Sequence, residues 1–386
     1  MLNDNKILIV TSLNPWDDIR IYKKEINTLK KKFSLDYIAT DDDERKFTVD
    51  NVKIICNKRP KDLKERFKNL LKISKLVQKN DYKIFHIHNP ELLLLVPFIK
   101  ITKKKSKVIF DMHEDFEEAI KDREWIPKYL RVFISKLYRF YLNFLGKYFL
   151  DYIIVTTPLI KQKFTKFKNV EVIENFAPLI EELPKKNLTP SNIQKLIDNE
   201  RNSIKVVFTG LINEQRGIIN VIEAVLKLDG VSLFLIGTWP ESFYEKFKNL
   251  KKKDLNNQIY LLESLNYDQM LAVMQQMDIG ILPYLPFGNH LVTRPNKLFE
   301  YMATSLPVIA SNYPLYKEVI DKGIGICINP CKIEEIKEAI QKLASSSDLR
   351  QAMGVRAFEL YKKYYNWDVE EKKLLNIYNN LLGEIN

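Results

Sequence analysis

The chain has 386 residues, of which 46% are hydrophobic and 28% are charged, a composition typical of a globular protein with room for two domains. Three cysteines, at positions 56, 327 and 331, are too few for a disulfide framework, and the last two lack the further ligands of a zinc site. The net charge of +12 lies in residues 1–180, which hold 36 basic and 24 acidic residues, so we expect an anionic partner for that half.

Strands and helices alternate along the chain, which predicts an α/β protein with parallel sheets and helices on both faces. In the first half, strands are expected at Lys6–Thr11, Leu35–Ala39, Val52–Ile55, Ile84–His88, Val108–Asp111, Tyr152–Thr156 and Val170–Ile173. In the second half, they are expected at Lys205–Phe208, Val231–Ile236, Ile259–Leu262, Ile279–Leu282, Val308–Ser311 and Ile326–Ile328. We interpret residues 1–180 and 204–365 as two doubly wound domains, and the polar stretch 181–203 as their linker.

The loop after the first strand, residues 11–20, contains no glycine and ends in Asp18-Ile19-Arg20. Asp18 could cap the following helix or bind a ligand directly. Arg20 could meet an anionic acceptor at the mouth of a cleft. Met1 is followed almost at once by a predicted strand, and no uncharged apolar run reaches the length of a membrane span, so we expect a cytoplasmic protein.

Three of the four histidines lie in the first half of the chain. His86 and His88 share one face of a strand, because side chains alternate along it. His113 follows the next strand, at a carboxyl end where open α/β sheets bind ligands. By residue type these three could form a metal site with Asp111, but we expect none, because strand alternation does not by itself bring four ligands together. Alternatively, His86 and His88 hydrogen-bond to backbone at strand ends.

A helix is expected from Lys128 to Leu150. Its basic residues recur at steps of three and four, so they share one face, and aromatic and aliphatic residues occupy the others. Either the apolar face packs on the sheet and the basic face is solvated, or the helix lies on an anionic membrane surface. The second alternative would place the protein peripherally on the inner face of the membrane.

The second half carries glycines at strand ends. Gly210 and Gly217 flank a strand-to-helix turn and would allow close approach of backbone to a ligand. Arg216 precedes the helix and could hold a diphosphate. Gly237 follows the next strand. Each turn taken alone is compatible with an ordinary connection.

The segment Arg294–Ala303 predicts a turn and a short helix, with Pro295 at its start. Lys297 and Glu300 then lie in the first two turns, where free N–H groups favour an anion. A lysine for phosphates and a carboxylate for ribose hydroxyls suit a nucleotide. The same two residues could also be an ordinary exposed pair on a helix.

This segment, with Pro-Asn-Lys-Leu-Phe-Glu-Tyr-Met before a Leu-Pro-Val strand, resembles the donor-site signature of glycosyltransferase family 4, and most closely that of a bacterial subgroup. The family has a two-glutamate pattern in which Glu300 matches the second glutamate and Val292 replaces the first. Ser305 stands where a glycine is usual. The turn at Gly210 also resembles the family pattern, but Leu211 replaces its arginine and Arg216 its lysine.

The resemblance implies the GT-B fold, with two Rossmann-like domains facing each other across a cleft and the C-terminal helix, residues 366–386, packing back on the first domain. It implies a retaining glycosyltransferase that needs no metal and no cofactor and moves a sugar from a nucleotide-diphosphate sugar, a UDP-sugar rather than a GDP-sugar, to a glycan or lipid-linked acceptor for bacterial surface polysaccharide or glycoconjugate. The first domain would bind the acceptor through Asp18, Arg20 and His88. The second would bind the donor through Gly210, Arg216, Gly217, Gly237, Arg294, Asn296, Lys297, Leu298 and Glu300. His113 and Glu300 are expected to be catalytic.

Two alternatives remain open at the level of sequence. A nucleotide-sugar epimerase can share this fold and donor site. The basic first half could instead belong to a non-catalytic module that binds anions or nucleic acid. No recognised base-reading motif is present, and we do not expect a nucleic-acid partner.

Overall fold

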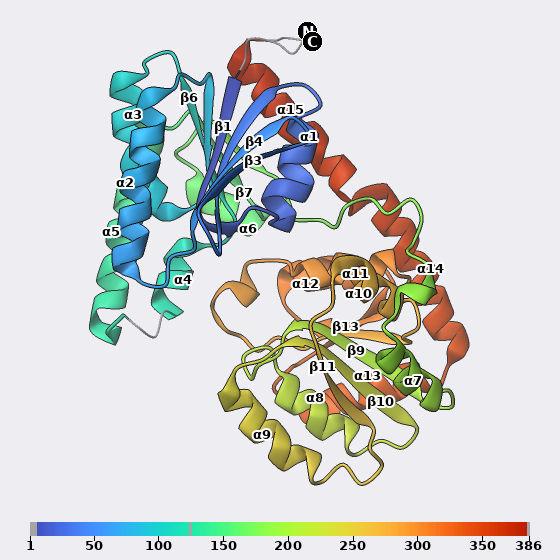
Figure 1. Cartoon of the computed structure of the whole chain (residues 1–386). Helices are drawn as coiled ribbons and strands as arrows, with labels where there is room; N and C mark the ends of the chain where they lie inside the picture. The colour runs from blue at the N-terminus through green and yellow to red at the C-terminus, as the bar shows by residue number, and fades with distance from the viewer. Residues whose placement is uncertain (1–5, 123–125, 384–386) are drawn as a thin grey trace. The chain divides into compact units, whose positions relative to one another are not determined.

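The computed structural model describes residues 6–122 and 126–383, which form two compact units (Figure 1). The first unit runs to Asn175 and includes the chain from Trp367 onward, and the second unit is Phe176–Asn366. Among the described residues, none of the helices combines the length and the apolar character that crossing a membrane requires.

The first unit is built on an eight-stranded sheet in the order β3-β4-β2-β1-β5-β6-β7-β8. All neighbouring strands are parallel except β3 and β4. The strands are β1 (Lys6–Pro15), β2 (Ser34–Asp41), β3 (Arg45–Val49), β4 (Val52–Lys58), β5 (Ile84–Ile87), β6 (Lys107–Met112), β7 (Tyr152–Val155) and β8 (Val170–Val172). Strand β3 is absent from the sequence prediction. It forms a hairpin with β4 through Asp50 and Asn51, whose φ values of 50° and 65° suit a tight turn between antiparallel strands.

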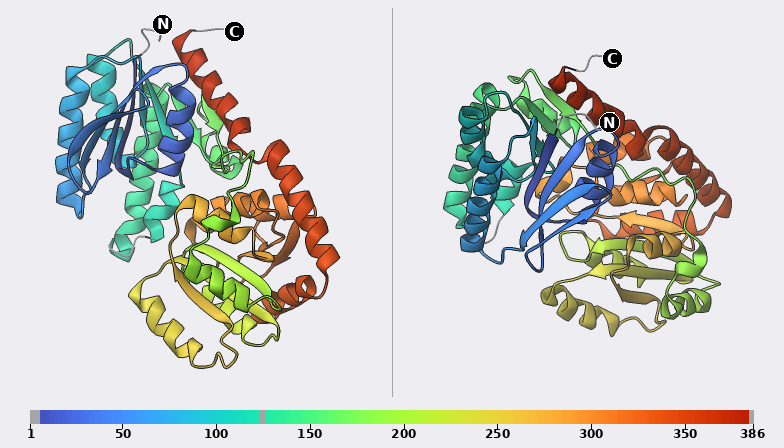
Figure 2. Two further views of the ribbon diagram at one scale, coloured as in Figure 1. Left: turned by 45° about the vertical axis from the view of Figure 1, so that its right-hand side comes forward. Right: turned by 45° about the horizontal axis from the view of Figure 1, so that its top comes forward.

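Helices cover both faces of this sheet (Figures 1 and 2). One face packs against α2 (Leu63–Lys79), α3 (Val96–Thr102) and α5 (Lys128–Tyr148), and the other against η1 (Ile19–Ile26), α1 (Asn27–Leu29) and α15 (Trp367–Leu382). The smaller helical segments are η2 (Pro90–Leu95), α4 (Phe116–Asp122), α6 (Pro158–Lys161) and η3 (Gln162–Phe164).

The C-terminal helix α15 belongs to the first unit, as predicted. Its first residue, Trp367, is buried, and the indole N–H donates to Thr28 Oγ1 at 3.0 Å. Near its other end the ring of Tyr378 stacks on Phe33, with centroids 5.6 Å apart. Apolar contacts with η1 and α1 therefore hold the last helix against the sheet.

The second unit has a six-stranded, all-parallel sheet in the order β11-β10-β9-β12-β13-β14, which is the doubly wound Rossmann order. Its strands are β9 (Ile204–Leu211), β10 (Val231–Thr238), β11 (Ile259–Glu263), β12 (Ile279–Leu282), β13 (Val308–Ser311) and β14 (Gly325–Ile328). Its helices are η4 (Lys186–Leu188), α7 (Ser191–Asn199), α8 (Ile218–Val225), α9 (Glu241–Lys251), α10 (Tyr267–Met274), η5 (Gly288–Leu291), α11 (Asn296–Ala303), α12 (Pro314–Ile320), α13 (Ile333–Ala344) and α14 (Ser347–Tyr364).

The structure corrects the predicted linker at residues 181–203. This stretch lies within the second unit and contains α7, which buries Ile193 and Ile197 one helical turn apart. The Nε2 atom of Gln276, just after α10, donates to Thr189 Oγ1 at 2.9 Å and ties the stretch to the unit. The sequence prediction missed this helix because most residues of the stretch are polar and only two isoleucines are buried. The first unit also ends at Asn175 rather than at residue 180.

Candidate active-site residues in each unit

In the second unit, two glycines lie side by side where β9 and β10 end. Gly237 pairs with Gly210 in the sheet register. A Cβ atom added to Gly237 would lie 1.7 Å from the Gly210 carbonyl oxygen, so only glycine fits there. Gly210 has φ of +118°, a conformation that side chains rarely adopt. At Gly210 and Gly237, near the carboxyl ends of β9 and β10, the backbone therefore has no side chain of its own to cover it.

Arg216 lies directly over Gly210. A Cβ atom added to Gly210 would be 3.1 Å from Arg216 Nη1 and 3.8 Å from Lys297 Cε. The guanidinium stacks over Tyr284, 5.1 Å from the ring centroid, and Nη1 donates to the Tyr284 hydroxyl at 3.3 Å. The next residue, Gly217, opens α8 with φ of +70°. The sequence did not single out Tyr284 as part of this group.

Helix α11 brings Lys297 and Glu300 to the same place. Lys297 Nζ lies 2.7 Å from Glu300 Oε2, and the Glu300 side chain is 6% exposed. The pair is therefore no ordinary surface pair, because an exposed i, i+3 pair would leave both groups in water. Asn296, at the first position of α11, is half-buried. Four predicted donor residues, at positions 210, 216, 297 and 300, thus converge through a glycine turn and a helix start.

Two predicted donor residues do not fit that role. Leu298 is fully buried in the core, and its N–H donates to Pro295 O at 3.0 Å. Arg294 is also buried, where its Nε donates to Leu315 O at 3.0 Å and its guanidinium forms an ion pair with Glu318. The contacts of Arg294 with Leu315 and Glu318 of α12 direct its guanidinium to the packing of the segment rather than to a phosphate.

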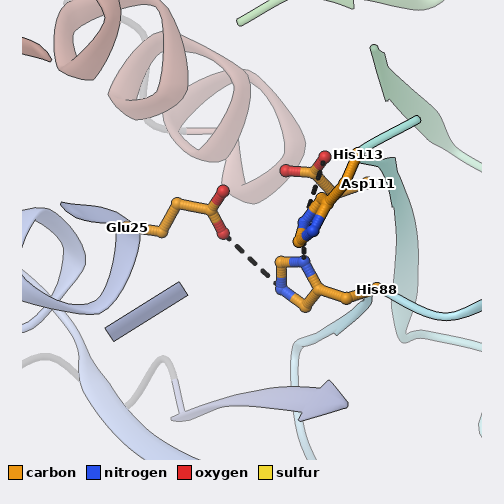
Figure 3. A group of neighbouring side chains, drawn as sticks. All are labelled: Glu25, His88, Asp111 and His113. Carbon is orange, nitrogen blue, oxygen red and sulfur yellow. Dashed lines mark hydrogen bonds and ion pairs between the residues drawn. The ribbon is translucent and has the colours of Figure 1, made fainter. Parts of the chain in front are cut away.

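In the first unit, the side chains of Glu25, His88, Asp111 and His113 point toward one another from η1, β6 and the loops after β5 and β6 (Figure 3). His88 Nδ1 is 2.8 Å from His113 Nε2, and His88 Nε2 is 3.5 Å from Glu25 Oε2. His113 Nε2 also lies 3.6 Å from Asp111 Oδ1. Glu25 and His88 are fully buried, and His113 is 21% exposed.

The structure contradicts a direct contact of Arg20 or His88 with an acceptor. Arg20 is 4% exposed, and its Nη2 donates to both oxygens of Asp111 at 3.1 and 2.9 Å. Its Nε lies 3.0 Å from Glu25 Oε1. His88 is buried between Glu25 and His113. The prediction for Arg20 was wrong because this residue lies in the first turn of η1, which directs its side chain toward Asp111 and away from solvent.

Asp18 caps the helix that contains Arg20. Its Oδ1 accepts hydrogen bonds from the N–H groups of Arg20 and Ile21, both at 2.9 Å, and its Oδ2 accepts one from Asn14 Nδ2 at 3.1 Å. The capping alternative is therefore the one that the contacts show. Asp18 orients Arg20 through the backbone.

Burial sets the protonation of this group. It raises the pKa of Glu25 well above the usual range, and the nearby Asp111 carboxylate adds to the effect against the opposing Arg20. Burial would also raise the pKa of Asp111, but the Arg20 guanidinium and neighbouring histidines hold it well below its usual range. Burial lowers the pKa of His88, and it lowers that of His113 to about 4. At neutral pH both histidines are neutral.

Glu25, His88, Asp111 and His113 offer ligand atoms that all lie within 4.8 Å of one another, a composition that could hold a metal ion. Arg20 already supplies a positive charge to both carboxylates at 2.9 and 3.0 Å. His86, a ligand in the sequence alternative, instead places its Nδ1 2.7 Å from the Tyr378 hydroxyl. The contacts describe a network in which one guanidinium faces two carboxyl groups.

Both halves of the chain match families of known proteins. Residues 191–360 match a family described as glycosyl transferases group 1, and residues 28–179 match glycosyltransferase family 4. The uncharacterized glycosyltransferase MJ1069 of Methanocaldococcus jannaschii is 25% identical over 299 residues, which cover 74% of this chain and 71% of that protein. The O-antigen biosynthesis glycosyltransferase WclY of Escherichia coli is 22% identical over 174 residues, 45% of this chain and 46% of its own length.

Solved structures share the architecture. Sucrose-phosphate synthase from Thermosynechococcus elongatus superposes with a TM-score of 0.75 at 14% identity, covering 99% of this chain and 100% of that one. A glycosyltransferase from Rickettsia africae gives 0.69 at 17% identity, with 99% and 100% covered. Anabaena HepE in complex with UDP gives 0.67 at 14% identity, with 97% and 100% covered. At these identities the likeness shows the fold.

Proposed function

We propose that the chain is a family 4-like glycosyltransferase of the GT-B fold, a retaining enzyme that moves a sugar from a UDP-sugar to a glycan or lipid-linked acceptor. One observation carries the donor assignment. Arg216 and Lys297 both lie against the bare backbone of Gly210, beside the buried carboxylate of Glu300.

The chemistry of a nucleotide-sugar donor suits this arrangement. A diphosphate is bulky and doubly charged, so it needs close backbone approach and cations, which Gly210, Arg216 and Lys297 provide. Tyr284 holds the guanidinium in place before the ligand arrives. Glu300 is a carboxylate acceptor that could take hydrogen bonds from ribose hydroxyls. These groups would be preorganised for the charge that develops on the leaving diphosphate.

In the proposed reaction, the bond between the anomeric carbon and the diphosphate oxygen breaks, and the acceptor oxygen bonds to the same face of that carbon. Because the attack is on the same face, the sugar keeps its configuration. The acceptor proton passes to the leaving phosphate oxygen, so no separate carboxylate base is needed. Arg216 and Lys297 would stabilise the departing charge without a metal ion. His113 would contact the sugar.

The relatives support the choice of donor and pathway. Anabaena HepE is described in complex with UDP and with UDP and glucose, which favours a UDP-sugar for this chain. WclY is described as an O-antigen biosynthesis enzyme, which favours a role in bacterial surface polysaccharide or glycoconjugate.

Helix α5 supports the further proposal of peripheral binding to an anionic membrane. It buries Ser135, Leu142 and Leu145, but its outer side exposes large apolar residues, at Tyr129, Leu130, Val132, Phe133, Leu137, Phe140, Phe144 and Tyr148. Lys128, Lys136 and Lys147 are exposed on the same helix. The alternative in which the apolar face packs on the sheet therefore holds only for part of that face, which includes Leu142 and Leu145. An aromatic stripe beside lysines fits the interface of an anionic bilayer.

A donor panel tests the assignment of the site. Affinity for UDP, GDP, UDP-sugars and GDP-sugars is measured by calorimetry for the wild type, Arg216→Ala and Glu300→Ala. We expect one UDP-sugar to bind, with the dissociation constant raised about tenfold to a hundredfold by Arg216→Ala, because a charge-assisted hydrogen bond contributes about 1.5–3 kcal/mol. Arg356→Ala, which removes an exposed arginine from the same unit, is the matched control. Equal affinity in Arg216→Ala and Arg356→Ala would remove Arg216 from the donor site.

Vesicle sedimentation tests the membrane proposal separately. The wild type should bind vesicles that contain anionic lipid and not purely zwitterionic ones. Phe133→Ser with Phe140→Ser should lose binding, whereas Leu255→Ser, at an 89% exposed leucine of the second unit, should keep it. Binding that survives the double substitution would exclude α5 as the docking surface.

A further inference from the structure

His113 is tied inward through one ring nitrogen. Its Nε2 lies 2.8 Å from His88 Nδ1, whereas Asp111 Oδ1, at 3.6 Å from the same nitrogen, is too far for a hydrogen bond. The other nitrogen of His88 lies 3.5 Å from Glu25 Oε2 (Figure 3). Only His113 of the three is exposed, at 21%. A row of three side chains therefore runs from a fully buried carboxyl group to a histidine at the surface of the unit.

The row allows two consistent arrangements of protons. A neutral imidazole donates through one nitrogen and accepts through the other. If Glu25 donates to His88 Nε2, then His88 Nδ1 donates to His113 Nε2, and the proton of His113 is on Nδ1. If Glu25 is ionised, both histidines carry the proton on Nε2, and Nδ1 of His113 is an acceptor. The protonation of a buried residue thus decides what His113 offers.

The surroundings of Glu25 favour the first arrangement. The charged and titratable groups that face the row are Arg20, Asp111, Asp18, Tyr37, His86 and Tyr378. Arg20 is the single cation among them, and it gives both Nη2 hydrogen bonds to Asp111. The second carboxyl group is left without a full counter-charge, and burial raises the pKa of Glu25.

The two oxygens of Glu25 have different neighbours. Oε1 lies 3.0 Å from Arg20 Nε, which can only donate, and Oε2 lies 3.5 Å from His88 Nε2. Among the residues that the structure describes, none of these four atoms has a hydrogen-bond partner, and a protonated carboxyl group would suit both neighbours, with its carbonyl oxygen at the arginine and its hydroxyl at the histidine. An ionised carboxylate would add a second negative charge beside Asp111 in a site that water does not reach.

We propose that Glu25 and His88 are positioning residues that hold His113 as the Nδ1–H tautomer, so that His113 presents a hydrogen-bond donor to the sugar. The inference rests on the proposed function in assigning the sugar as the partner. A donor stabilises a sugar oxygen and does not remove the acceptor proton, which agrees with transfer of that proton to the leaving phosphate.

Nitrogen-15 NMR of labelled histidines tests the tautomer directly, and the chain has only four histidines. In the wild type, His88 and His113 should both show a protonated Nδ1 and a bare Nε2. Glu25→Gln should keep this pattern, because an amide can place its oxygen at Arg20 and its NH₂ at His88. Glu25→Leu should give a mixture of His113 tautomers. Protonated Nε2 atoms in the wild type, or an unchanged pattern in a folded Glu25→Leu protein, would overturn the proposal.

Measurements of kcat and KM distinguish a positioning role of Glu25 from a role in folding. Glu25→Leu should lower kcat roughly tenfold or more with a smaller change in donor KM, and Glu25→Gln should restore most of it. Asp36→Asn is the control, since it removes another buried carboxylate of the same sheet, one bound by Tyr82 rather than by His88. Because the NMR readout needs no substrate, a protein without transferase activity that still shows the expected tautomers would refute the proposed function and the sugar as partner, and would leave the tautomer assignment standing.

Discussion

Replacing His113 by glutamine should make the stability of the first unit less sensitive to acid. Burial lowers the pKa of His113 to about 4 in the folded protein, against an ordinary histidine value of about 6.5. Between these values the unfolded chain takes up a proton that the folded chain refuses. The contribution of His113 is therefore fully present above about pH 6.5 and is lost as the pH falls toward 4.

The size of the effect follows from the shift. One pKa unit corresponds to about 1.4 kcal/mol, so His113 accounts for a loss of roughly 3 kcal/mol of unfolding free energy across this window. Burial lowers the pKa of His88 with the same sign, and the raised pKa of Glu25 acts with the opposite sign, costing stability as the pH rises. Both remain in the variant, so the difference between the two proteins isolates His113.

The assay is urea unfolding followed through the histidine resonances, three of which belong to the first unit, at several values between about pH 4.5 and about pH 7. The free-energy difference between wild type and His113→Gln should change by about 1.4 kcal/mol per pH unit. The control is Tyr378→Phe, because burial raises the pKa of the Tyr378 hydroxyl far above this pH range. Loss of its hydrogen bond to His86 should lower the unfolding free energy by a constant amount of about 1 kcal/mol. A difference for His113→Gln that is flat with pH would refute the lowered pKa and the burial argument behind it.

Three further outcomes follow from the second unit. Arg216→Lys should bind UDP more weakly than wild type, because an ammonium lacks the planar stacking on Tyr284, and equal affinities by calorimetry would count against that contact. Gly217→Ala should lower the melting temperature, since its φ is +70° and the added Cβ would lie 2.0 Å from Pro283 O; an unchanged melting curve would show that the turn relaxes freely. Tyr301→Phe should cost about 1 kcal/mol in urea unfolding, because its hydroxyl donates to Val207 O at 3.2 Å, and no loss would mean that water replaces the bond.

The two segments that carry the candidate donor residues were predictable, because each is local in sequence. Gly210 and Arg216 come from one strand-to-helix turn, and Lys297 and Glu300 from one helix. Period and helix-start chemistry predict each segment, whereas the resemblance to family 4 implied that the two segments meet at one donor site. Ser305 shows the same local logic, since its φ of 58° occupies a conformation that suits the glycine usual in the resembled motif.

The acceptor-side prediction failed where it depended on distant segments. Arg20 and His88 were expected to meet a ligand, but both are buried, and the partners that bury Arg20 are Glu25, from the same helix, and Asp111, from β6. A charged residue in a loop after a strand looks exposed when read locally. Arg20 can neutralise the buried carboxylate of Asp111 only because the sheet order places β6 two strands away from β1.

The sequence by itself determined the alternation of strands and helices and the two Rossmann-like halves, because these follow from hydrophobic period and from contacts within a few residues. Tertiary structure alone decided the rest. It added the β3–β4 hairpin, moved the stretch 181–203 into the second unit, and joined Glu25, His88 and His113 into one row. Burial and long-range pairing set the charge of such groups, and neither can be read from a residue's neighbours along the chain.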